Sequence, residues 1–247
     1  MSPPSWLAQC AVSEHQTTEL WFKLAIHELT ACLQRLAEGD VATACKIIAR
    51  IKAIQHTLYV QWQVLATMTP AQYVEFRSAL RTASGFQSVQ YRVVEFLLGQ
   101  KDPAMLRFHK DDPADLAALD AALRTPSLYD QTLRLAARRG LPIPREVLER
   151  DVATPYVPSE GVARALAMVY EDTRTWWDLY DLCEKLMDLD EQFAHWRFRH
   201  YKTVARIIGE KPGTGGSAGV HFLRQRVDGC FFPELYHLRT TLRDRPV

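Results

Sequence analysis

The sequence predicts an all-α protein, a bundle of long antiparallel helices with a small helical insertion near residues 102–158. Three observations lead to this prediction. Apolar side chains recur at helical spacing along residues 17–38 and 41–66. Glycine or proline marks the ends of the periodic segments. No segment shows a sustained alternation of apolar and polar residues between turn signals, as a half-buried strand would.

Two long helices are expected first. The helix over residues 17–38 is closed by Gly39, and the second helix spans residues 41–66. His27 falls on the face of Leu20 and Leu24, so we interpret it as a core or boundary residue. The apolar positions that define the first helix are Leu20, Leu24, Leu29, Cys32, Leu33 and Leu36.

A third helix is expected to begin at Pro70, because proline suits the first turn and Thr69 can cap it. The dipeptide at 84–85 breaks this helix, and Ser84 is the expected N-cap of a fourth helix. That helix ends near Leu98, where Gly99 follows.

The middle of the chain, residues 102–158, is rich in proline and charge and predicts shorter helices joined by loops. Asp112 and Thr125 are candidate N-caps there, and Ser159 is another just beyond. No internal repeat or low-complexity tract interrupts the chain.

The last third of the chain predicts one long helix and two short ones. The long helix begins near Gly161 or near Asp172 and ends at Ile208, before Gly209. The short helices are expected over residues 217–226 and 233–242.

Composition narrows the class of protein. The 247 residues are 47% hydrophobic, which predicts one globular domain over 1–247. The formal net charge is +1, which argues against a nucleic-acid or anionic-membrane surface. No membrane span and no signal peptide are expected. The five cysteines have no CxxC spacing, so we expect reduced thiols in a cytoplasmic protein.

No multidentate metal site is evident among the eight histidines. His195 and His200 lie five residues apart and point away from one another on a helix. Only one Glu-x-x-His spacing exists, Glu234 to His237, whereas a di-iron bundle needs two, so we interpret it as a surface pair. Isolated histidines fit an axial ligand of haem, since the porphyrin supplies the other four donors. They fit a non-catalytic helical protein equally well.

Two further features have both a functional and a structural interpretation. Tyr73 and Arg77 lie four residues apart on one helical face and form either a carboxylate clamp or a surface arginine over a tyrosine ring. The glycine-rich segment 209–219 is either a lid beside a ligand or an ordinary connection. It follows a helix and lacks a Gly-Lys-Ser/Thr ending, so it is not a phosphate loop.

Three segments resemble the tryptophan 2,3-dioxygenase family, in the family's order. They are EHQTTELWFKLAIHEL (14–29), TMTPAQYVEFRSALRTASGFQSVQYRVVEFLLG (67–99) and RHYKTVARIIGEKPGTGGSAGVHFLR (199–224). The resemblance covers residues 14 to about 242. It implies an all-α haem b protein, a homotetramer or homodimer. It also implies that both atoms of O2 enter an indole amino acid across the indole C2–C3 bond, giving N-formylkynurenine from tryptophan.

The resemblance also implies roles for single residues around the haem. His200, and not His195, matches the axial ligand of the haem iron. His15 matches the distal histidine that hydrogen-bonds the indole N–H. Ser84 matches a serine above the haem.

Other residues match the part of the site that holds the amino-acid end of the substrate. Tyr73 and Arg77 match the pair that binds the carboxylate. Thr214 matches the loop threonine that closes over the ammonium and carboxylate groups. Gly213 and Gly215, on either side of it, are expected beside the cofactor.

Two departures from the family pattern leave other activities open. Only fourteen residues precede His15, where the family has a longer segment that reaches a neighbouring subunit. Ala11 stands where the family has a phenylalanine against the indole, so we expect a wider or wetter site. One alternative is therefore a member that oxygenates a substituted tryptophan or another indole in secondary metabolism, with one oxygen atom inserted instead of two. Another is a catalytically impaired haem-binding homologue.

Overall fold

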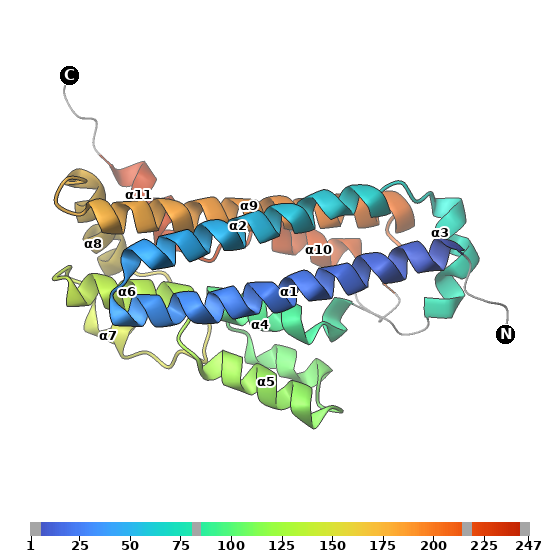
Figure 1. Cartoon of the computed structure of the whole chain (residues 1–247), viewed down its shortest axis with the longest axis horizontal. Coiled ribbons are helices and arrows are strands. Elements are labelled where there is room, and N and C mark those ends of the chain that lie inside the picture. The colour runs from blue at the N-terminus through green and yellow to red at the C-terminus, as the bar shows by residue number, and fades with distance from the viewer. Residues whose placement is uncertain (1–5, 81–84, 214–218, 243–247) are drawn as a thin grey trace, which may run out of the picture.

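The computed structural model describes residues 6–80, 85–213 and 219–242, and the all-α prediction is confirmed over these ranges. Three long helices, α1 (Trp6–Glu38), α2 (Val41–Leu65) and α9 (Trp177–Ile208), lie side by side along the molecule (Figure 1). None of the described helices is long and apolar enough to cross a membrane.

The long helices are not all antiparallel. Glu28 on α1 contacts Arg50 on α2, and Glu14 contacts Gln61, so these two helices run in opposite directions. On α2 and α9 the paired residues rise together, as Lys52 with Asp188 and Tyr59 with His195 show. α2 and α9 are therefore parallel, which the long connection between them permits.

Helix α1 begins earlier than expected and buries a different face. Leu20 is 70% exposed, and Leu24 and His27 are exposed as well, so the prediction that they face the core is wrong. The buried face carries Phe22 and Leu29. Both sets of residues recur at helical spacing, and periodicity alone does not say which of two apolar faces packs inward.

The next helices confirm one predicted cap and correct another. Thr69 caps α3 (Pro70–Phe76) in a capping box with Gln72, as expected. The short helices η1 (Arg77–Leu80) and η2 (Gly85–Gln87) follow. Helix α4 (Val89–Leu98) is capped by Ser88, whose side chain accepts a hydrogen bond from the Tyr91 backbone N–H, and not by Ser84, which lies outside the described residues.

The middle segment contains the expected short helices. They are η3 (Pro103–Phe108), α5 (Pro113–Arg124), α6 (Leu128–Arg138) and α7 (Arg145–Leu148). Asp112 caps α5 as predicted, but Thr125 ends α5 and Ser127 caps α6 in its place. Ser127 is favoured because Asp130, three residues later, completes a capping box.

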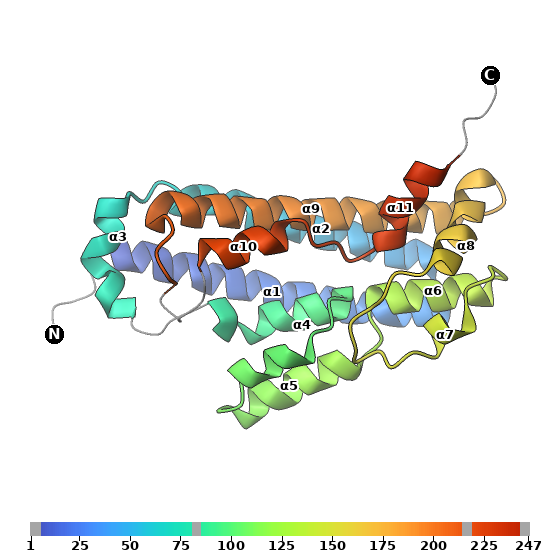
Figure 2. The same cartoon turned by 180° about the vertical axis from the view of Figure 1, so that it is seen from behind.

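Two helices, α8 (Glu160–Glu171) and α9, occupy the range in which the sequence predicted one long helix. The two expected starts, Gly161 and Asp172, lie near the beginnings of these two helices. Helix α8 follows Ser159, which makes no side-chain cap, and Asp172 is its C-cap. Helix α9 begins at Trp177. The last helices, α10 (Val220–Val227) and α11 (Pro233–Thr241), close the chain, with α8 and α11 at the end of the molecule opposite α3 (Figures 1 and 2).

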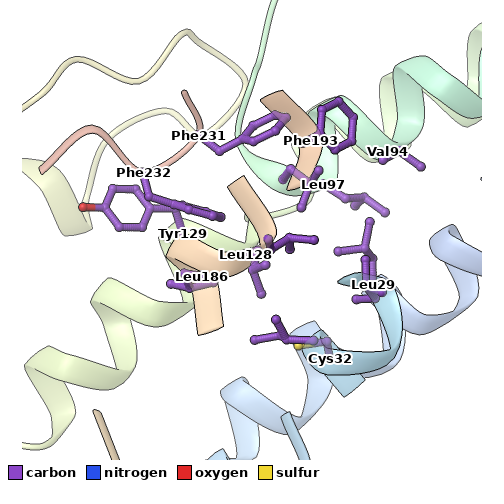
Figure 3. Close-up of a cluster of buried hydrophobic side chains, with 14 of the residues drawn as sticks. Leu29, Cys32, Val94, Leu97, Leu128, Tyr129, Leu186, Phe193, Phe231 and Phe232 are labelled. Atoms are coloured by element: carbon purple, nitrogen blue, oxygen red, sulfur yellow. The ribbon is translucent and has the colours of Figure 1, made fainter. Parts of the chain in front are cut away.

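The core joins the long helices to α4, α6 and the segment before α11. Phe193 of α9 and Phe231 and Phe232 meet Leu97 and Leu128 there (Figure 3). The residues beside this core contradict the interpretation of Glu234 as part of a surface pair. Glu234 is not a surface residue but is 2% exposed, and it accepts hydrogen bonds from Tyr129 Oη (2.8 Å), Tyr156 Oη (2.5 Å) and the Ser159 backbone N–H (2.8 Å).

Candidate functional site

Two inward helix faces bring His15 and His200 together near the α3 end of the bundle. His15 lies two turns before Phe22 on α1, and the two share a face. Phe22 is 3% exposed, whereas the His15 side chain is 65% exposed. The inward face of α1 is therefore covered at Phe22 and open at His15. His200 follows buried Phe193 by two turns in the same way on α9.

The imidazole of His200 is packed among aromatic rings and is neutral at ordinary pH. The Trp62 ring stacks on it at 4.5 Å between centroids and 14° between planes, and Trp196 lies at 5.5 Å. Burial, and to a smaller extent the proximity of His15, lowers the pKa of His200 to about 4. A neutral imidazole is the form that coordinates a metal ion.

A hydrogen bond to its own helix determines which ring nitrogen of His15 carries a proton. His15 Nδ1 lies 2.7 Å from the Ala11 backbone oxygen. The Glu14 carboxylate lies 3.4 Å from the same nitrogen. Both oxygens only accept, so Nδ1 carries a proton, and in the tautomer protonated at Nδ1 alone Nε2 is an acceptor. His15 therefore presents an exposed acceptor from the inward face of α1, which suits an N–H group of a ligand. Ala11 is half-buried and packs against the core one turn earlier.

The predicted carboxylate clamp lies at the junction of α3 and η1. Tyr73 and Arg77 are both half-buried, and the Arg77 guanidinium carbon stands 5.9 Å from the Tyr73 ring centroid. Arg77 Nη2 donates to the Pro212 backbone oxygen at 2.8 Å. Arg77 forms no ion pair within the described part of the chain, so its charge is available to an anion.

The hydrogen bond to Pro212 links the clamp to the glycine-rich segment. Gly213, the next residue, is half-buried. At the far end of the segment Gly219 has φ +56°, and a Cβ there would lie 2.8 Å from the Lys211 backbone oxygen. Lys211 and Gly219 therefore approach closely, which glycine alone permits. Ser84, Thr214 and Gly215 lie outside the described residues.

Two aromatic residues of this region were missed at the level of sequence. Trp196 stands one turn before His200 on the same helix, and its position on the histidine face is a signal that periodicity offers. Trp62 comes from another helix, and nothing in its local sequence indicates the contact. Both indole Nε1 atoms are buried and have no hydrogen-bond partner among the described residues. No group of three or more histidine, cysteine or acidic side chains suited to a metal ion occurs there either.

Comparison with known proteins gives a consistent result. A profile described as tryptophan 2,3-dioxygenase matches residues 10–168 and 164–242. A protein of that name from Kineococcus radiotolerans is 51% identical over 94% of this chain and 81% of its own length. Proteins of the same name from Exiguobacterium sibiricum and Myxococcus xanthus are 50% and 47% identical, over 92% and 99% of this chain and 82% and 84% of their own lengths.

Proposed function

This chain belongs to the tryptophan 2,3-dioxygenase family, and from that premise we propose that it is a haem-dependent dioxygenase. It cleaves the indole C2–C3 bond of L-tryptophan with O2 and forms N-formylkynurenine. The observation that supports this most is the convergence of a neutral His200 with the exposed acceptor of His15, beside a helix that carries Arg77.

The residues present fit a haem group. A haem needs one neutral imidazole from the protein, and burial keeps His200 in that form. A non-haem metal would need several ligands in one place, and the described residues contain no such group. We therefore propose that His200 holds haem b through its iron. When bound, the haem supplies the activation of O2.

The side chains of this protein bind and orient the substrate. His15 Nε2 accepts the indole N–H, which fixes one end of the ring. Arg77 gives the carboxylate two parallel donors and Tyr73 gives it a third. We propose that Thr214 contacts the amino-acid end of the substrate and that Ser84 lies above the haem. Holding both ends of the substrate limits its motion, and this positioning is the protein's main contribution to the rate.

A second candidate function rests on Ala11. Its methyl group occupies the inward face one turn before His15, where a larger side chain would fill space near the indole. A ring-substituted tryptophan fits this smaller residue. For either candidate function we propose a cytoplasmic enzyme that is a homotetramer or homodimer. Molecular sizing of the haem-loaded protein tests the oligomeric state.

Turnover with isotopically heavy O2 tests the function. The haem-loaded, reduced enzyme is given tryptophan, methyl-tryptophans and hydroxy-tryptophans, and products are identified by mass spectrometry. Two heavy oxygen atoms in the tryptophan product are expected. One heavy atom would identify a monooxygenase, and no product from any indole would identify an impaired homologue. Preference for a substituted tryptophan that Ala11→Phe abolishes would favour the second candidate.

A further inference from the structure

The closest ring contact of the His200 imidazole is with a residue that the proposed function leaves unused. Trp62 lies in the last turn of α2, it is buried, and its ring is nearly parallel to the imidazole at 4.5 Å. Aromatic pairs at this separation attract each other beyond their buried area. The stack holds only for one orientation of the imidazole plane, since turning the ring about its Cβ–Cγ bond separates the two faces.

A second indole restricts the imidazole from another direction. Trp196 lies 5.5 Å from His200 with a 50° angle between the rings, and 6.3 Å from Trp62. Trp196 is itself packed against Tyr91 and Phe22. The two tryptophans therefore form a rigid corner around one face and one edge of the histidine.

The stack takes a role that a hydrogen bond usually fills. A metal-binding histidine almost always donates its second ring N–H to a carboxylate or carbonyl, which fixes the plane of the ring. No residue in the described ranges is hydrogen-bonded to the His200 imidazole. Among the described residues, two ring contacts hold the imidazole, and the Trp62 contact is the parallel one.

We propose that Trp62 is a positioning residue for the haem ligand, and that its ring face holds the plane of the His200 imidazole. This inference rests on the proposed function, because it takes His200 as the axial ligand. Its consequence is that the ring face of residue 62, and not its N–H group, sets the strength and orientation of the bond from histidine to iron.

Two substitutions separate the ring face from the N–H group. Trp62→Leu removes the ring, whereas Trp62→Phe keeps a ring face and removes only the N–H. The matched control is Phe232→Leu, which removes a fully buried ring from the segment before α11 that has no ring contact with the histidine or the two tryptophans. Melting temperatures report the loss of packing in each variant, and Trp62→Met replaces Trp62→Leu if the latter does not fold.

Three measurements on the holoprotein report on the ligand itself. They are the rate of haem transfer to an excess of apomyoglobin, the iron–histidine stretching band of the ferrous protein and the ferric/ferrous midpoint potential. With Trp62→Leu we expect haem loss about tenfold faster, a shifted and broadened stretching band and a changed potential. Trp62→Phe should resemble the wild type, and Phe232→Leu should lower only the melting temperature.

The outcomes distinguish this inference from the function on which it rests. A wild-type band and haem-loss rate in Trp62→Leu would overturn the positioning role, and so would a Trp62→Phe variant as impaired as Trp62→Leu. A wild-type holoprotein with no iron–histidine band, or with one that His200→Ala leaves intact, would instead overturn His200 as the ligand.

Discussion

At the scale of single residues, surroundings give the two site histidines different chemistry. His200 is enclosed by indole rings and stays neutral to about pH 4, whereas His15 is exposed and hydrogen-bonded to its own helix. One residue is thereby suited to bind a metal and the other to accept a proton donor from a ligand.

The depressed pKa of His200 predicts a pH dependence of stability for the haem-free protein. The unfolded chain binds a proton near pH 6.5, while the folded protein does so only near pH 4. The contribution is therefore complete above pH 6.5 and is lost as the pH falls to 4. It amounts to about 3 kcal/mol at most. Urea unfolding of the wild type and His200→Gln should show a stability difference that changes across this window. His27→Gln, at an exposed position on α1, is the control and should show no such change, and a flat His200 difference would contradict the burial argument.

Arg77 offers a second test at the residue scale. Arg77→Ala removes a charge-assisted contact to the substrate carboxylate, worth about 1.5–3 kcal/mol. We expect KM for tryptophan to rise about 10- to 100-fold, with a smaller change in kcat. Tryptamine, which lacks the carboxylate, should react equally poorly with both enzymes. If Arg77→Ala slowed tryptamine as much as tryptophan, Arg77 would act on the fold and not on the carboxylate. Arg206→Ala, on the exposed side of α9, is the matched control.

At the scale of secondary structure, local signals predicted where most helices end but not which faces they bury. Thr69, Asp112 and Gly99 lie at the expected helix ends, because a cap depends on neighbours along the chain. The burial of α1 depends on distant helices, and there Leu20 and His27 proved exposed. Neighbouring residues can also compete for one capping position, since Ser127 and not the predicted Thr125 caps α6.

The turn before α10 gives a prediction about a helix start. Gly219→Ala places a side chain at φ +56° and 2.8 Å from the Lys211 oxygen, so both strain and a clash result. We expect a loss of about 1–2 kcal/mol from backbone strain alone, and a further loss from the contact. Gly39→Ala isolates the strain, because φ is +87° there and no atom lies within 4 Å. Equal losses of melting temperature in the two variants would mean that the close approach is not rigid. A raised KM for tryptophan only in Gly219→Ala would link the turn to the site.

At the scale of the whole molecule, the site is made by segments that the chain keeps far apart. His15, Arg77 and His200 lie on α1, on η1 directly after α3, and on α9, and these elements share one end of the bundle (Figures 1 and 2). Spacing along the sequence held no signal for this arrangement, and only the resemblance to a family predicted these residues together. The parallel pairing of α2 with α9, which presents Trp62 to His200, was equally beyond local pattern.

The opposite end of the bundle holds the structure together without touching the site, and this separation is testable. Glu234 ties α11 to Tyr129 of α6 and to the segment before α8 through three hydrogen bonds. Glu234→Ala leaves the buried Tyr129 hydroxyl, the half-buried Tyr156 hydroxyl and the Ser159 backbone N–H without their acceptor, at a cost of about 2–4 kcal/mol. We expect a lower melting temperature and urea midpoint, with the haem-loss rate and KM unchanged. Because α9 runs the full length of the molecule between the two ends, faster haem loss in this variant would show that the helix transmits the damage. An unchanged rate would mean that the aromatic corner around His200 is supported locally by α1, α2 and α4.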